Sequence, residues 1–424
     1  MRLLIKGGRV IDPANSLDDT MDILVEEDRI VAVEKDLPDS DAQIINADNK
    51  LVCPGFIDMH VHLREPGQEY KEDITSGSRA AAAGGFTTVC CMPNTEPAID
   101  NAAIASFVRE RARKTGLVNV YPIGAITRGR EGNELSEMAE LVSAGCVAVS
   151  DDGSPVMRSD VMRNALEYAK MFDLPVLAHC EDLNLSRDGQ MHEGYYSIIC
   201  GLKGIPVEAE EVMIARDIML ARLTGGHLHV CHISTRGAVE LIREAKAEGI
   251  KVTCEVTPHH LILSDEVVDG YDADTKVSPP LRSKEHIMAL REALNEGVID
   301  CIATDHAPHH RESKDCEYVL ASPGISGSET AVALIMDKLV NPGILNIEQM
   351  VSLFTTGPAD VLGLTQGSLT PGKVADITMI DPQVVKTVDP RRFYSKGKNT
   401  PFKSMKLKGW PCMTIRAGQV VELG

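Results

Sequence analysis

The middle of the chain repeats one pattern eight times: a short apolar strand that ends in polar residues, followed in most units by a helical stretch. The predicted strands are residues 55–63, 87–93, 119–127, 146–152, 175–180, 227–234, 251–257 and 300–306. Apolar residues spaced at i, i+3 and i+4 predict helices that include residues 74–83, 159–172, 208–223, 237–248 and 284–296. Strands that alternate with helices form parallel sheets, so this α/β pattern favours a (β/α)8 TIM-type barrel. An open doubly wound sheet is the alternative, but no GxGxxG motif follows the first strand.

Both ends of the chain differ from this middle, because they contain short β-type segments separated by turns. These segments are residues 3–11, 21–25, 375–380 and 413–421. We therefore expect residues 1–54 and 366–424 to form one composite small β domain, a β-sandwich built from both chain ends. Residues 55–365 would form the barrel.

Composition excludes some classes of partner. The 424 residues are 43% hydrophobic and 25% charged, and 62 acidic against 43 basic residues give a formal net charge of −19. Such an acidic chain lacks the basic face that nucleic acids require, and no apolar run approaches the roughly 20 residues that cross a bilayer. The eleven cysteines show no CxxC spacing, which predicts buried reduced thiols rather than a disulfide framework. Because the apolar run at the N-terminus is too short for a signal peptide, we expect a cytoplasmic protein.

Side chains that can bind a metal recur where the predicted strands end. They are His60 and His62 at the first strand, Asp151 and Asp152 at the fourth, His179 at the fifth, His232 at the sixth, and Asp305 and His306 at the eighth. The active site of a (β/α)8 barrel lies at the carboxyl ends of its strands, so these side chains should share one pole. His60 and His62 are two positions apart on a strand and face the same way. His259 and His260, at the end of the seventh strand, are interpreted as structural or supporting residues rather than ligands.

Four of these imidazoles with two of these carboxylates already exceed the four ligands of a structural zinc site. The set therefore indicates a catalytic centre with two zinc ions, or one with open coordination positions. Zinc lowers the pKa of bound water to about 7, and a carboxylate nearby can pass the proton to a leaving nitrogen. The predicted chemistry is hydrolysis, or its reverse, at an amide-like carbon.

A series of segments, taken in order, resembles the class I dihydroorotases of the amidohydrolase superfamily over essentially the whole chain. They are residues 58–67 (DMHVHLREPG), 92–95 (MPNT), 151–153 (DDG), 178–181 (AHCE), 231–235 (CHIST), 303–309 (ATDHAPH), 324–330 (GISGSET) and 398–402 (KNTPF). The resemblance implies one or two Zn²⁺ per subunit, with His60, His62, His179 and His232 as ligands. It also implies that Asp152 bridges or completes the metal site and that Asp305 is both a ligand and the catalytic acid/base.

The resemblance further implies a set of substrate contacts. Arg64 and Asn94 would hold the substrate carboxylate, and His62 would contact substrate as well as metal. Ser278 stands where the family pattern Lys-x-Asn-Pro-Pro-Leu-Arg has Asn, and its shorter hydroxyl offers one donor proton instead of two. The substrate-contacting loop of the family is matched by His309, Pro323 and Gly324. The polar stretch from His309 to Pro323 is predicted to be a mobile lid.

The implied enzyme is a cyclic amide hydrolase that interconverts N-carbamoyl-L-aspartate and L-dihydroorotate plus water, the third step of pyrimidine biosynthesis. The alternatives are another cyclic amidohydrolase, such as a dihydropyrimidinase or an allantoinase, and a non-catalytic scaffold subunit. Dihydropyrimidinases and allantoinases carry a carboxylated lysine at strand four, but residues 147–152 of this chain, which occupy that place, contain no lysine. A non-catalytic scaffold would have lost a metal ligand, and all six are present here.

The implied partner is this small-molecule substrate, with neither nucleic acid nor membrane. A homodimer and a complex with aspartate carbamoyltransferase are the two candidate assemblies.

Overall fold

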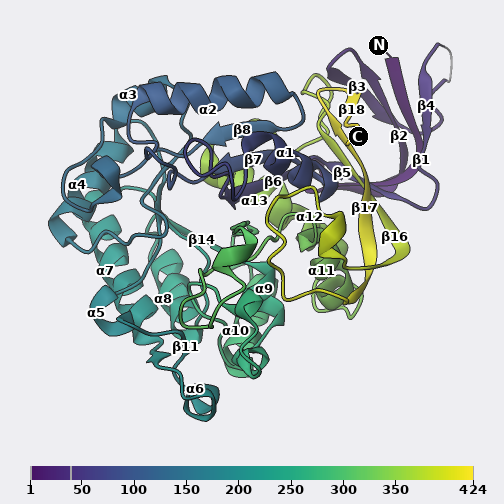
Figure 1. Ribbon diagram of the computed structural model, residues 1–424. Helices are drawn as coiled ribbons and strands as arrows, with labels where there is room; N and C mark the ends of the chain where they lie inside the picture. Colours follow the sequence, from purple (N-terminus) through teal and green to yellow (C-terminus); the bar gives the residue numbers. More distant parts are fainter. Residues whose placement is uncertain (1, 39–40, 424) are drawn as a thin grey trace.

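Eight short parallel strands lie where the sequence pattern predicts them. They are β6 (Phe56–Val61), β7 (Phe86–Cys91), β8 (Asn119–Pro122), β9 (Val149–Ser150), β10 (Val176–Ala178), β13 (Leu228–Val230), β14 (Val252–Val256) and β15 (Cys301–Ile302). They come from a computed structural model that describes residues 2–38 and 41–423 (Figure 1). Six of the eight strands are buried along their whole length. Continuous apolar burial is expected of parallel strands that are covered on both faces.

Two single bridges close these strands into a ring. β6, β7 and β8 form one hydrogen-bonded sheet, and β9, β10, β13, β14 and β15 form another. A parallel bridge between Gly124 and Val149 joins β8 to β9, and a parallel bridge between Val61 and His306 joins β15 to β6. We call these two junctions the seams. The closed parallel ring confirms the predicted (β/α)8 barrel and excludes the open doubly wound sheet.

Each seam carries a buried aspartate that accepts two hydrogen bonds from a threonine on the opposite side. Asp58 accepts the Thr304 backbone N–H at 3.0 Å and the Thr304 hydroxyl at 2.6 Å. Asp151 accepts the Thr127 backbone N–H at 3.0 Å and the Thr127 hydroxyl at 2.5 Å. Thr304 directly precedes Asp305, and Asp151 directly precedes Asp152. The paired bonds therefore fix the backbone beside two predicted metal ligands.

Helices follow the strands and cover the outside of the barrel (Figure 1). They are α1 (Ile74–Ala83), α2 (Ala102–Thr115), α3 (Met138–Ser143), α4 (Ser159–Lys170), α7 (Glu208–Thr224), α8 (Arg236–Ala247), α10 (Lys284–Asn295), α11 (Ala331–Ile335), α12 (Ile347–Phe354) and α13 (Thr356–Leu362). The five predicted helices match α1, α4, α7, α8 and α10 to within two residues at each end. Their ends follow from local chemistry: Thr235 caps α8 by accepting the Ala238 N–H at 3.0 Å, and Gly116, with a φ of 66°, ends α2.

Short elements lie in the loops that follow the strands, at the pole where the predicted ligands meet. They are α5 (Leu183–Ser186), β11 (Met191–His192), α6 (Tyr195–Cys200) and β12 (Gly204–Ile205) after β10, and α9 (Pro258–Ile262) after β14. In a barrel of this kind such loops build the site, while the strands below hold it rigid.

Strands from both chain ends form a second sheet, where both termini lie (Figure 1). Its strands are β1 (Arg2–Asp12), β2 (Leu17–Glu26), β3 (Arg29–Glu34), β4 (Gln43–Asn46), β5 (Leu51–Pro54), β16 (Ile377–Thr387), β17 (Lys406–Arg416) and β18 (Gln419–Val420). β5 and β16 pair antiparallel, with Pro54 opposite Ile377, so the two ends of the chain meet in this sheet. A separate apolar core that includes Leu3, Ile23 and Ile415 packs on it. This confirms a small β unit built from both ends, and the exact boundaries at residues 54 and 366 stay a prediction.

Two chain-wide expectations concern thiols and membranes. Nine of the eleven cysteines are buried and free, while Cys316 and Cys412 are free and exposed. The prediction of buried reduced thiols is thereby confirmed for nine of them. Within residues 2–38 and 41–423, every helix is too short or too polar to cross a membrane.

Candidate functional site

Six side chains converge at the carboxyl ends of the barrel strands. The residues, all predicted as metal ligands, are His60, His62, Asp152, His179, His232 and Asp305, each at most 7% exposed. They form two groups of three, His60 with His62 and Asp305, and Asp152 with His179 and His232. The potential ligand atoms within each group lie within 4.8 Å of one another. Residues that are up to 245 positions apart in the sequence thus meet at one point.

Asp152 lies between the two groups. Its Oδ2 is 3.4 Å from His60 Nε2 and 3.5 Å from His62 Nε2. Its Oδ1 is 3.4 Å from His232 Nε2 and 3.7 Å from His179 Nδ1. Each carboxylate oxygen therefore faces a different pair of histidines, as is required of a ligand shared by two metal ions.

Unpartnered buried atoms test whether a metal fits here. Among the residues that the structure describes, His60 Nε2 and Asp152 Oδ1 are buried and have no hydrogen-bond partner. A buried polar group without a partner costs about 1–3 kcal/mol, and each ligand group contains one such atom, which a metal ion would satisfy. Imidazole nitrogens and carboxylate oxygens suit zinc and related divalent metals. The donor set therefore fits a divalent metal pair.

Electrostatics keep both central carboxylates ionised. Burial would by itself raise the pKa of Asp152, but the imidazoles around it, His60 first among them, hold that pKa well below its usual range. At Asp305, too, burial by itself would raise the pKa of the carboxyl group. The neighbouring His60 and His62 outweigh burial, and the pKa of Asp305 is lowered. Asp305 Oδ1 lies 2.9 Å from His62 Nε2. Both carboxylates are thus available as ligands or as proton acceptors.

A buried guanidinium and an amide lie beside the metal groups. Arg64 is 7% exposed, and its Nε has no hydrogen-bond partner among the described residues. Burial lowers the pKa of Arg64 to about 10, which still leaves it charged at neutral pH. Asn94 Oδ1 is 2.9 Å from His62 Nδ1, which directs the amide nitrogen of Asn94 away from the ring as a donor. Both side chains suit the carboxylate of an anionic substrate.

The predicted substrate loop is assembled by a residue from the far end of the chain. His309 Nε2 donates to the Pro323 carbonyl at 2.9 Å. Asn399 donates to the carbonyls of Ala307 and Gly324, at 3.1 Å and 2.9 Å, and its Oδ1 accepts the His309 N–H at 3.0 Å. Gly324 has a φ of 139°, and a Cβ there would lie 2.7 Å from the Cβ of Ala307. The KNTPF segment therefore ties the two halves of this loop together.

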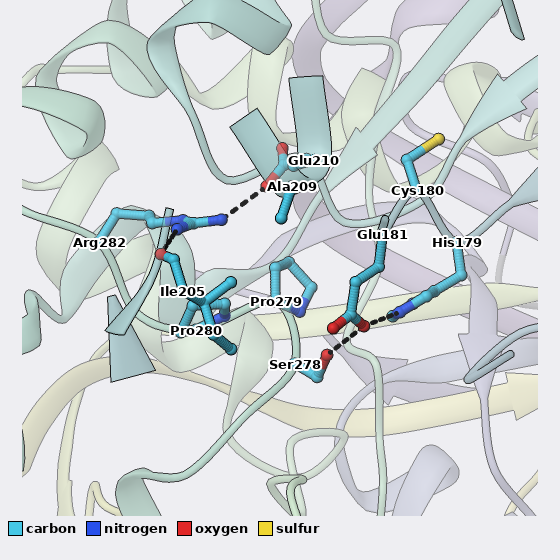
Figure 2. A pocket seen from close by; sticks show the side chains of 10 residues that line it. All are labelled: His179, Cys180, Glu181, Ile205, Ala209, Glu210, Ser278, Pro279, Pro280 and Arg282. Carbon is cyan, nitrogen blue, oxygen red and sulfur yellow. Dashed lines mark hydrogen bonds and ion pairs between the residues drawn. The ribbon is translucent and has the colours of Figure 1, made fainter. Parts of the chain in front are cut away.

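Ser278, the departure from the family pattern, has its hydroxyl engaged inside the protein. Its Oγ donates to Glu181 Oε2 at 3.4 Å, and the same oxygen lies 3.0 Å from His179 Nε2 (Figure 2). The pocket in Figure 2 that holds these three residues also contains Arg282, which contacts Glu210. Ser278 is thus linked through Glu181 to a predicted metal ligand.

The predicted lid is anchored in this structure. Tyr318 is 4% exposed and packs with Met191, Cys200 and Val268. Lys276 Nζ donates at 2.9 Å to the carbonyls of Tyr318 and Val319. The segment 309–323 therefore lies against the barrel, and its opening stays a prediction.

Two residues near the centre, the buried Glu255 and the half-buried Arg130, were not predicted from the sequence motifs. Glu255 on β14 is 0% exposed, and its Oε1 lies 2.5 Å from His60 Nδ1. Arg130 donates to the Asp152 carbonyl at 2.7 Å. A charged residue inside the apolar strand Val-Thr-Cys-Glu-Val was a visible signal for Glu255, whereas Arg130 lies in a loop without any motif.

Both ring nitrogens of His260 form hydrogen bonds, one with the Thr257 hydroxyl and one with the Pro279 carbonyl, which agrees with the structural role predicted for His260.

Known proteins similar to this chain point to one family. A family model described as dihydro-orotase-like matches residues 49–238, and one for the amidohydrolase family matches residues 227–422. The dihydroorotase of Pelotomaculum thermopropionicum is 56% identical over 421 residues, which cover 99% of this chain and 98% of that protein. The dihydroorotase of Trichlorobacter lovleyi is 51% identical, with 100% of both chains covered.

Solved structures show the same fold. The L-hydantoinase (dihydropyrimidinase) from Arthrobacter aurescens superposes with a TM-score of 0.90 at 26% identity, covering 99% of this chain and 95% of that one. Dihydropyrimidinase from Brevibacillus agri superposes with a TM-score of 0.87 at 25% identity, with the same coverage of 99% and 95%. The two dihydroorotases are thus more similar in sequence to this chain than the two hydantoinases, which share its architecture.

Proposed function

The chain belongs to the dihydroorotase-like family of the amidohydrolases, and we propose that it acts as a zinc-dependent dihydroorotase. The reaction is the reversible closure of N-carbamoyl-L-aspartate to L-dihydroorotate and water, a step of pyrimidine biosynthesis. The observation that carries the proposal is the position of Asp152, whose two oxygens face two separate pairs of histidines. The identity of 50–56% to dihydroorotases over nearly the whole chain supports the choice of substrate.

We propose two zinc ions per subunit, since two ligand groups share Asp152. One ion would be held by His60, His62 and Asp305 with Asp152, and the other by His179 and His232 with Asp152. When bound, zinc would lower the pKa of water to about 7 and polarise the amide carbonyl.

Asp305 is the proposed proton carrier. Its carboxylate is ionised and lies next to His62, so it can accept a proton from the attacking water. It then delivers that proton to the ring nitrogen as the amide bond breaks. In the direction of ring closure, Asp305 takes a proton from the carbamoyl nitrogen as that nitrogen attacks the side-chain carboxyl carbon. Asp305 then returns the proton to the hydroxyl of that carboxyl, whose C–O bond breaks as water leaves.

Arg64 and Asn94 are proposed to hold the free carboxylate of the substrate, with His309, Pro323 and Gly324 on the facing loop. The positive charge of Arg64 offsets, at this point, the negative charge of the protein as a whole. Because the Ser278 hydroxyl already contacts Glu181, we propose that it orders this wall of the site through that contact.

We predict that Arg64→Lys raises the KM for dihydroorotate about 10-fold to 100-fold. The lysine keeps the charge but loses the forked pair of donors, and a hydrogen bond to a charged group contributes about 1.5–3 kcal/mol. The measurement is steady-state kinetics in both directions. Arg128→Lys is the matched control, because Arg128 is exposed and pairs with Glu134. An unchanged KM for Arg64→Lys contradicts the carboxylate-binding role.

One substrate panel tests the proposed function. Zinc-loaded protein is offered L-dihydroorotate, dihydrouracil and allantoin, and hydrolysis of dihydroorotate alone is expected. Dihydropyrimidinase is the second candidate because of the structural similarity to such enzymes, and turnover of dihydrouracil would favour it. Lack of turnover with all three substrates, in protein that binds zinc, would favour a scaffold subunit.

The assembly and location of the enzyme are also proposals. The reaction belongs to nucleotide synthesis, which supports a cytoplasmic location. A homodimer and a complex with aspartate carbamoyltransferase are both compatible with a barrel whose site opens at one pole, and mass measurement of the native protein distinguishes them.

A further inference from the structure

A carboxylate lies inside the barrel beneath the metal groups and takes no part in the reaction proposed above. Glu255 is 0% exposed and sits on β14 between Cys254 and Val256, which belong to the apolar core. Taking an ionised group out of water is energetically unfavourable, and hydrogen bonds must offset that cost. A residue of this kind in an apolar strand therefore requires an explanation from its contacts.

Glu255 contacts one ligand from each metal group. Its Oε1 is 2.5 Å from His60 Nδ1, and the same oxygen accepts the backbone N–H of His232 at 3.4 Å. An ionised carboxylate only accepts hydrogen bonds, so His60 carries its proton on Nδ1. The lone pair of His60 then lies on Nε2, the buried atom that faces Asp152 without a hydrogen-bond partner among the described residues.

Further polar residues hold Glu255 in turn. His229 Nε2 lies 3.4 Å from Glu255 Oε2, and His229 Nδ1 lies 2.9 Å from the Thr253 hydroxyl. Thr253 and Glu255 are two positions apart on β14 and face the same way, and Thr253 pairs with His229 across β13 and β14. His227 Nε2 lies 2.8 Å from the Thr253 hydroxyl. One assignment satisfies every contact: His227 donates to Thr253, Thr253 to His229, and both His229 and His60 to Glu255.

We propose that Glu255 is a positioning residue, which holds His60 as the Nδ1–H tautomer with Nε2 aimed at the metal and which orients His232 through its backbone. The chain of His229 and Thr253 fixes Glu255 itself. This inference rests on the proposed metal centre. Partners of this kind typically change metal affinity 10-fold to 100-fold when they are removed.

The test is the metal affinity of Glu255→Gln, measured by competition with a chromogenic chelator for Zn²⁺. In wild-type protein the two oxygens of Glu255 face the N–H groups of His60 and His229. A glutamine side chain has only one oxygen, so its NH₂ group would face the N–H of one of these histidines, and two donors would meet. We expect zinc binding to weaken 10-fold to 100-fold, and the visible absorption bands of the Co²⁺-substituted protein to shift. Asp217→Asn is the matched control, since Asp217 is a buried carboxylate on α7 that pairs with Arg216. This control should lower Tm and leave both metal readouts unchanged.

Wild-type zinc affinity and an unchanged cobalt spectrum in Glu255→Gln overturn the inference. His229, Glu255 and Cys301 could themselves hold an ion, so loss of one extra zinc with the other affinities unchanged overturns it as well. If Glu255→Gln does not fold, Thr253→Val replaces it, with an expected several-fold loss of zinc affinity; no loss contradicts the chain. Wild-type protein that binds zinc but does not turn over dihydroorotate defeats the proposed function alone, because the zinc readouts still test Glu255.

Discussion

Asp305→Asn lowers the turnover of dihydroorotate by about 10²-fold to 10⁴-fold, the range that a single acid/base group supplies. Asparagine has nearly the same shape as aspartate, so the loop beside the β15/β6 seam keeps its backbone. The amide cannot accept the proton that has to reach the ring nitrogen. Since the histidines keep the pKa of Asp305 low, its carboxylate is ionised at neutral pH.

The measurement is kcat in both directions, together with zinc content and circular dichroism of the same samples. Asp160→Asn, at the exposed start of α4, is the control for a carboxylate change far from the site. Zinc content separates the two roles of Asp305, because loss of turnover with zinc retained isolates the proton transfer. Retained turnover in Asp305→Asn removes the acid/base role.

Removal of the metal abolishes turnover and lowers Tm, and addition of zinc restores both. A ligand that binds only the folded state stabilises it by about 4 kcal/mol when its free concentration is 1,000 times its Kd. Without an ion, Asp152 Oδ1 and His60 Nε2 stay buried without partners, and two carboxylates of like charge, Asp152 and Asp305, lie within 3.5 Å of the same atom, His62 Nε2. Both effects destabilise the metal-free barrel.

Calorimetry after dialysis against a chelator, with and without added zinc, measures this dependence. Asp152→Asn is the informative variant, because Asp152 faces both ligand groups and its change weakens both. Added zinc should therefore raise the Tm of this variant less than it raises the Tm of the wild-type protein. A metal-free protein with the Tm of the zinc-loaded form would contradict the proposed centre.

The barrel could be predicted from the sequence because each of its strands is a short apolar run that ends in polar residues. The ligands could be predicted for the same reason, since His60 and Asp305 occupy strand ends that a closed barrel brings to one pole. Contacts that depend on tertiary packing could not be read from local patterns. Asn399 lies 75 positions after Gly324, yet it organises the substrate loop, and only the folded chain places its amide between the two carbonyls.

Other features needed atomic geometry. The sequence cannot show which oxygen of Asp152 faces which histidine, so the count of ions stayed open. It also cannot show that the Ser278 hydroxyl donates a hydrogen bond to Glu181. Glu255 is a different case, because a lone acidic residue in a buried strand is visible in the sequence, but its partner His60 lies 195 positions away.

The two seams give the barrel a property that a uniform ring would lack. His60 and His62 belong to the three-stranded sheet, whereas the other four ligands follow strands of the five-stranded sheet. Neither sheet alone holds a complete set of ligands for the ion at His60, His62 and Asp305. The complete centre therefore exists only when both sheets have joined, and an ion at His60, His62 and Asp305 would link one sheet to the other. Recovery of activity during refolding should consequently require that the two sheets have joined at both seams, which the formation of individual helices and strands does not reveal.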